Sequence, residues 1–239
     1  MNRKGWLLAV VLGALLVRPV VAGPACPHGE GAETLDWYLV EGRSCSIGDF
    51  TVKGFTYSNT GVTMPESAIT VYPSAGPQGP SLRFSSATDF YVGPGDRAVL
   101  ELVYNIDPPP IIIRGFEEDL EAYTPNFPGF VTIDTWLCVG GAFPGRCGAQ
   151  EVVDPVLLPL HLAHYGADNP DNILTDSIMF EPTSILGVWH TITLDSGGTG
   201  DASFTSLGNQ AYTVPEPGTW LLLGCGLLSL AVLRRRRAG

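Results

Sequence analysis

Short runs of alternating apolar and polar residues dominate the middle of the chain, separated by clusters of glycine, proline, asparagine and aspartate. Residues 98–106, 131–138 and 188–194 each place apolar side chains at every second position, as strands with one buried face do. No stretch of this region keeps a helical period over three turns. Many short strands with this punctuation predict an all-β fold, a β-sandwich of the jelly-roll or immunoglobulin-like kind.

Two local features refine this prediction. The alternation in residues 50–57 changes phase at Gly54, which predicts a β-bulge. Residues 188–194 and 202–207 flank a glycine-rich turn, and we expect them to form a hairpin. The last short strand, at residues 211–214, is expected to end the domain.

Charge is distributed unevenly along the 239 residues, whose formal net charge is −11. All 24 acidic residues lie between Gly23 and Thr219, where only six of the 13 basic residues occur, so this region carries −18. The remaining basic residues flank two apolar ends. A nucleic-acid binder that works through a basic surface is therefore excluded, and the layout argues against an ordinary cytosolic enzyme.

Residues 1–22 have the features of a secretory signal peptide. Two basic residues precede an apolar core at residues 6–17, and small or tolerated residues follow up to Ala22. We expect cleavage after Ala22, with cleavage after Ala25 as the alternative. The Sec translocon and signal peptidase are then partners of the chain, and residues 23–213 form an exported ectodomain.

The C-terminal residues 214–239 combine three features in order. An extended segment comes first, then an apolar run at residues 220–233, then a basic cluster. The extended segment is Val214, Pro215, Glu216 and Pro217, and the cluster is Arg234, Arg235, Arg236 and Arg237. The apolar run is short against the roughly 20 residues of a full transmembrane helix. The positive-inside rule places the arginines on the cytoplasmic side of the inner membrane and the acidic middle outside.

This tripartite order resembles the PEP-CTERM sorting signal of Gram-negative bacteria over residues 214–238. The resemblance implies that an exosortase, a membrane-embedded cysteine enzyme, recognises and removes the tail. Proline keeps the triplet extended, and Glu216 resists entry into the bilayer. A permanent tail anchor without processing is the alternative. Residues 44–57 bear a looser resemblance to the start of a recurrent ectodomain of PEP-CTERM proteins, which implies a β-rich surface protein without an assigned activity.

Four of the five cysteines form an even set in the exported region, since Cys225 lies in the C-terminal apolar run. Disulfides persist outside the cytoplasm, and four cysteines allow three pairings. We favour the two local pairs, which are Cys26 with Cys45 and Cys138 with Cys147. The rival interpretation, a zinc site, lacks the close spacing of paired cysteine ligands.

The motif formed by His161 and His164 stands beside Tyr165 and Asp168. On a helix the two histidines could share a metal. Prolines precede them, however, and no glutamate completes a metalloprotease motif. A polar loop or a strand edge is the simpler interpretation.

Two oxygen-rich segments have similarly simple interpretations. The loop Asp195–Asp201 suits calcium in its residue types, and a glycine-rich turn explains it equally well. The run of Glu117, Glu118, Asp119 and Glu121 is expected to be a solvated strand edge that discourages aggregation. We expect no metal and no cofactor.

Two classes of function remain open for the ectodomain. One is a structural or adhesive module associated with extracellular polysaccharide. The other is a carbohydrate-active or other enzyme on a sandwich, which needs two carboxylates held across a cleft. The sequence does not pair its acids, and it has no nucleophile elbow. Sugar binding uses exposed aromatic residues, for which Trp37, Tyr38, Trp136 and Trp189 are candidates, although core packing is the simpler interpretation of each. We expect a non-enzymatic protein of the cell surface or extracellular matrix.

Overall fold

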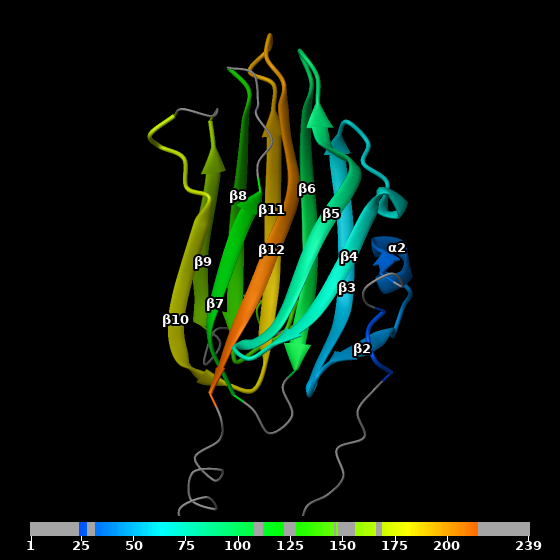
Figure 1. The fold of residues 1–239 in the computed structure, drawn as a ribbon, viewed down its shortest axis with the longest axis vertical. Coiled ribbons are helices and arrows are strands. Elements are labelled where there is room, and N and C mark those ends of the chain that lie inside the picture. Colours follow the sequence, from blue (N-terminus) through cyan, green and yellow to red (C-terminus); the bar gives the residue numbers. More distant parts are fainter. Residues whose placement is uncertain are drawn as a thin grey trace, which may run out of the picture.

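The computed structural model describes residues 24–27, 32–107, 112–121, 128–145, 147, 156–165 and 169–214. These residues form two six-stranded sheets that stack as a front and a back layer (Figure 1). The prediction of an all-β fold with two packed sheets is confirmed. Among the residues described here, no helix is long and apolar enough to cross a membrane. The predicted signal peptide and the apolar C-terminal run lie outside these ranges.

Every strand pairs antiparallel with its neighbours. In order across the sheet, the front sheet consists of β1 (Glu33–Thr34), β4 (Ile69–Gly76), β5 (Gly79–Val92), β12 (Ala202–Val214), β7 (Ile112–Glu121) and β10 (Thr175–Thr183). The back sheet consists of β2 (Ser44–Ile47), β3 (Phe50–Gly61), β6 (Arg97–Asp107), β11 (Leu186–Asp195), β8 (Phe130–Val139) and β9 (Val156–His164). The short helical turns are α2 (Leu35–Tyr38) and η2 (Glu66–Ala68).

The core lies between the sheets and follows from the period-two pattern. On β11, for example, Val188, His190, Ile192 and Leu194 are buried, while the residues between them face away from the core. Burying an aliphatic side chain of this size contributes about 1.5–3 kcal/mol. The inward side chains of both sheets form one apolar cluster, so the two layers stabilise each other.

The predicted bulge at Gly54 is confirmed. The register between β3 and β6 shifts between Lys53 and Thr56, and Gly54 has a φ of 65°. That left-handed conformation favours glycine.

The predicted hairpin between residues 188–194 and 202–207 is wrong. The strand β11 pairs with β6 and β8 in the back sheet, whereas β12 pairs with β5 and β7 in the front sheet. The glycine-rich turn between them therefore carries the chain from one layer to the other. Both β11 and β12 bury one face, and each buries it against the sheet to which the other strand belongs.

Both outer strands of the back sheet are covered. On β9, the backbone N–H of His161 donates to Asp176 Oδ2 at 3.0 Å, and Ala163 forms a bridge with Ile173. On β2, Ser46 exchanges backbone hydrogen bonds with Cys26 and with Pro24. Covered edges leave fewer unpaired backbone groups for strand-to-strand aggregation.

The described chain enters and leaves at the same end of the sandwich. The first described segment, residues 24–27, lies at the lower end of the sandwich in Figure 1, and β12 ends there too. Val214 is still paired, with Ile112 on β7. The sandwich therefore continues up to the residue before Pro215.

Candidate functional site

The outer face of the back sheet carries a row of apolar side chains that crosses its strands. Val103, Trp189, Trp136 and Pro159 are successive Cα partners on β6, β11, β8 and β9. We call these four residues the apolar row, and Thr56 on β3 continues it beyond Val103. Trp136 is 42% exposed. Alternation explains its position, because the core residues of β8 lie on either side of it in the chain.

A second row lies two residues further along each strand. Ser58, Glu101, Thr191, Asp134 and His161 are successive Cα partners on the same five strands, and we call them the polar row. Ser58 Oγ donates to Glu101 Oε2 at 3.1 Å, and His161 Nδ1 lies 2.7 Å from Asp134 Oδ1. Two residues of strand separate the rows by about 7 Å.

A groove of about 370 Å³ opens where these rows meet the loop after β8. Val103 and Trp189 from the apolar row and Glu101 from the polar row line it, and Phe143 and Pro144 of the loop form a wall. The ring of Phe143 meets Trp189 edge-on, with centroids 5.8 Å apart at 78°. The groove thus combines aromatic surface with a carboxylate.

The loop wall is fixed by a buried amide. Asn105 Nδ2 donates to the carbonyl of Phe143 at 2.7 Å, and the N–H of Phe143 donates to Asn105 Oδ1 at 2.7 Å. A Cβ on Gly187 would lie 2.9 Å from the Phe143 ring, so glycine is needed beneath it. The Cys138–Cys147 disulfide closes the same loop.

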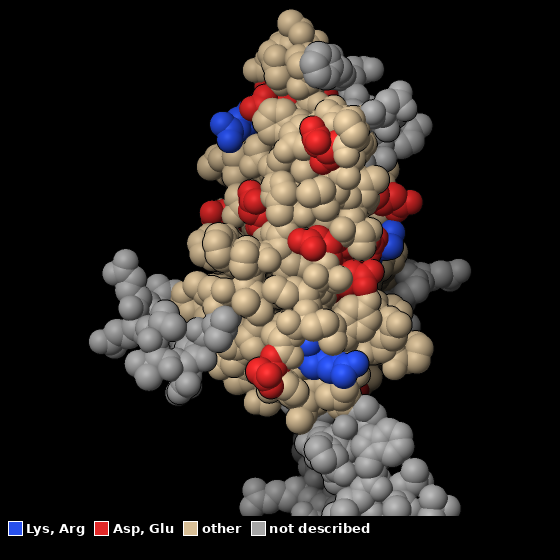
Figure 2. Space-filling model, turned by 90° about the vertical axis from the view of Figure 1, so that its left-hand side faces the viewer, with Lys and Arg blue, Asp and Glu red and all other residues tan. Residues whose placement is uncertain are grey.

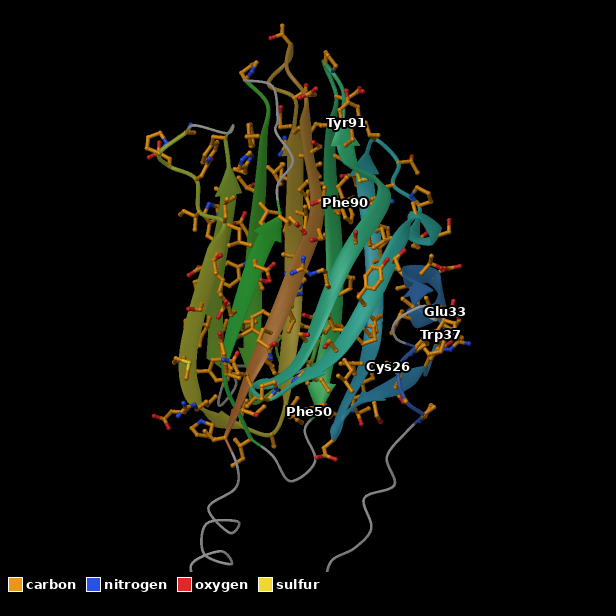
Figure 3. All side chains as sticks on the ribbon, viewed as in Figure 1. Cys26, Glu33, Trp37, Phe50, Phe90 and Tyr91 are labelled. Atoms are coloured by element: carbon orange, nitrogen blue, oxygen red, sulfur yellow. A yellow bond between two sulfur atoms is a disulfide. The ribbon has the colours of Figure 1, made fainter. Side chains whose placement is uncertain are left out.

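The second disulfide, Cys26–Cys45, joins the start of the described chain to β2, with Cα atoms 4.7 Å apart. Figure 3 places Cys26 beside β2 at the lower end. Both are the local pairs favoured among the three possible pairings.

The four aromatic candidates separate into two groups. Trp136 and Trp189 lie side by side in register, and Trp136 is not a core residue, contrary to the core-packing interpretation. Tyr38 is buried, while Trp37 lies under the Arg43 guanidinium at 4.4 Å. This second pair is on α2, away from the row.

The two histidines of the predicted motif do not face one another. The strand β9 turns them to opposite faces, so that His161 joins the polar row and His164 is buried. Burial lowers the pKa of His164. Within the ranges that the structure describes, no three His, Cys, Asp or Glu residues gather as metal ligands. Asp168, the remaining polar candidate of this motif, lies outside those ranges.

The turn Asp195–Asp201 is held by backbone and side-chain contacts. The N–H of Gly197 donates to Asp195 Oδ1 at 2.8 Å, and that of Gly200 to the Ser196 carbonyl at 3.0 Å. Arg97 Nε approaches the Asp195 carboxylate at 3.7 Å. These contacts fit a turn between the sheets.

The predicted solvated edge at residues 117–121 is wrong in two respects. The strand β7 is internal, between β12 and β10, and alternation turns Glu118 into the core. Its outward neighbours do face solvent: Asp119 and Glu121 pair with Arg83 at 3.1 and 3.0 Å. The period-two pattern of this strand places Glu118 on the buried face. The surrounding acidic residues hide that pattern in the sequence.

Glu118 belongs to a polar cluster between the sheets. Its Oε1 lies 3.0 Å from His190 Nδ1, which also lies 2.7 Å from Thr135 Oγ1. Neither carboxylate oxygen makes a hydrogen bond to a described residue. Asn209 Nδ2 lies 3.0 Å from His190 Nε2 and donates to the Tyr104 hydroxyl at 2.8 Å. Burial, and next the Glu118 carboxylate, raise the pKa of Tyr104 well above its ordinary value.

From the last two residues of β12 onward, residues 213–237 match the PEP-CTERM protein-sorting motif. The chain carries a PEP-CTERM sorting signal. Of the predicted sorting residues, Val214 is the last residue of β12. The Pro215–Pro217 triplet and the Arg234–Arg237 cluster lie outside the described residues.

The solved structures to which this chain is similar are distant. The enzymatically active domain of bacteriophage CBA120 tailspike protein 4 is 15% identical with a TM-score of 0.30, and the match covers 64% of this chain but only 19% of that one. The carbohydrate-binding module TmCBM61, in complex with β-1,4-galactotriose, is 12% identical with a TM-score of 0.27, covering 67% of this chain and 88% of that one. A family 11 module from Clostridium thermocellum has a TM-score of 0.25 at 12% identity, covering 70% and 89%. Because these scores are low, they carry no inference about activity. No curated protein matches the chain.

Proposed function

We propose that this chain is an exported protein of the cell surface or extracellular matrix, processed at its C-terminus by an exosortase. The observation that carries the proposal is the sorting motif at residues 213–237. In this proposal the sandwich is a binding module without catalytic activity, associated with extracellular polysaccharide.

The placement of the tail supports this function. The match begins at Thr213, and β12 ends at Val214, so the sorting triplet follows the sandwich without a linker. A tail held in the membrane would bring the lower end of the sandwich close to the outer surface. Only the segment after Val214 then needs to be accessible to the membrane enzyme.

Two further features fit an extracellular location. Both disulfides require an oxidising compartment to persist, and they fasten the first described residues and the β8–β9 loop. Figure 2 shows acidic side chains spread over the side of the sandwich formed by β9 and β10, with few basic ones. A strongly acidic surface favours solubility.

The decisive variant changes only the triplet. With Pro215→Ala and Glu216→Ala together, we expect normal export but retention of the tail, seen in a pulse–chase experiment as a precursor that stays in the membrane fraction. Thr219→Ala, just beyond the triplet, is the matched control and should be processed. Normal processing of the double variant would refute recognition of the triplet.

A further inference from the structure

Trp136 and Trp189 present an aromatic surface that folding alone does not explain. Trp136 is 42% exposed although it sits on an internal strand with paired neighbours on both sides. Its partner in register, Trp189, forms the floor of the groove beside Phe143. Rigid indole side chains on paired strands lose little conformational freedom when a ligand covers them.

The apolar row and the polar row lie about 7 Å apart, a separation that suits one class of ligand. A pyranose ring has an apolar C–H face and a rim of hydroxyl groups. Its face can lie on Trp136 or Trp189, while its hydroxyls donate to the Glu101 and Asp134 carboxylates about 7 Å away. We propose that the apolar and polar rows together bind a neutral polysaccharide that lies across the strands of the back sheet.

Charge selects a neutral polymer over an anionic one. The two rows contain the carboxylates of Glu101 and Asp134 and neither lysine nor arginine. Only His161, beside Asp134 at 2.7 Å, offers a group that can become cationic. Uronate or sulfated chains would meet like charge here, whereas neutral hydroxyls find acceptors.

The length of the two rows favours a polysaccharide over a single sugar. The rows cross five strands, from β3 to β9, and strands about 4.8 Å apart make this path roughly 19 Å long. Several sugar rings can be accommodated on such a path. The wall at Phe143 and Pro144 flanks the path on one side, and Asn105 holds it in place before the ligand arrives.

The inference rests on the proposed extracellular location, but its test does not depend on tail processing. The full chain, purified in a detergent without a sugar headgroup, is run in native gels containing mixed-linkage β-glucan, galactan or xylan, with alginate as the anionic polymer. We expect retardation by at least one neutral polymer and none by alginate. Trp136→Ala should weaken that binding at least about tenfold, whereas Tyr91→Ala should not. Tyr91 is the matched control, since it is 48% exposed on the front sheet near the upper end (Figure 3).

Trp189→Phe provides a second variant that preserves a ring in the groove, with thermal unfolding as the check on its fold. A loss of polysaccharide affinity smaller than that of Trp136→Ala, with an unchanged thermal unfolding midpoint, would support the site.

Absence of binding to all three neutral polymers, or unchanged binding by Trp136→Ala, overturns the inference. Equal binding of alginate overturns the charge argument, and shortened polysaccharide products would make the face an active site. A change of oligomeric state in Trp136→Ala without polysaccharide binding would make it an interface between copies. Each result can be read whether or not the tail is processed, so failure of the sorting proposal remains distinguishable.

Discussion

The contact between Glu118 and His190 offers the sharpest test of how the sandwich core is built. We consider Glu118→Leu, His190→Leu and the double variant. The two side chains are fully buried, with Oε1 and Nδ1 3.0 Å apart. Removal of one partner of a buried pair typically costs about 3–5 kcal/mol, because the other stays buried without compensation.

The expected result is strong coupling. Each single variant should lower the free energy of unfolding by about 3–5 kcal/mol, which for a domain of this size lowers the Tm by roughly 6–20 °C. The double variant should be less destabilised than the sum of the singles by at least about 2 kcal/mol, because apolar side chains then face each other. Glu118→Gln keeps the shape and removes the charge, which separates electrostatics from packing.

Thermal and urea unfolding of the full chain, followed by circular dichroism, measures these differences. Additive effects of the two single variants, within about 0.5 kcal/mol, would refute the argument that the pair acts as a unit. Equal stability of Glu118→Gln and the wild type would show that charge contributes nothing to the contact.

Three further predictions concern the core, the first disulfide and the loop wall. The raised pKa of Tyr104 means that the folded state holds the hydroxyl proton more tightly than the unfolded state does. The free energy of unfolding should therefore be at its full value below about pH 10 and decline above it. Unfolding measured at a series of alkaline pH values should show a shallower decline in Tyr104→Phe. Replacement of both Cys26 and Cys45 by serine should cost about 3 kcal/mol and expose the chain before β2 to protease, and unchanged urea midpoints would contradict it. Gly187→Ala should displace the wall of the β8–β9 loop and weaken polysaccharide binding, whereas Gly93→Ala, whose Cβ meets only ordinary contacts, should leave the gel shift unchanged.

The sequence was sufficient for the buried faces of three strands of the back sheet. Period-two alternation on β6, β8 and β11 placed the core residues correctly, and the same alternation puts Trp136 on the outer face. Glu118 was assigned to a solvated edge because its acidic neighbours suggested solvent. Its partner, His190, is far away in the chain and belongs to the other sheet.

Sheet membership and the groove could not be predicted, because both depend on long-range pairing. Adjacency in the sequence suggested a hairpin across the turn after β11, but the next strand joins the opposite sheet. The rows across the back sheet exist only once β3, β6, β11, β8 and β9 are ordered side by side. The wall likewise depends on Asn105 binding the backbone of Phe143, 38 residues away.

The most direct test of the central claim is the C-terminal peptide map, by mass spectrometry, of the protein isolated from its native host. Processing by an exosortase predicts a mature end near Val214–Pro217, with residues 220–239 missing from the bulk of the protein. Any added mass at that end would identify a group joined to it. An intact tail carrying Arg234–Arg237 on most molecules would contradict the account and make the chain a permanently anchored protein.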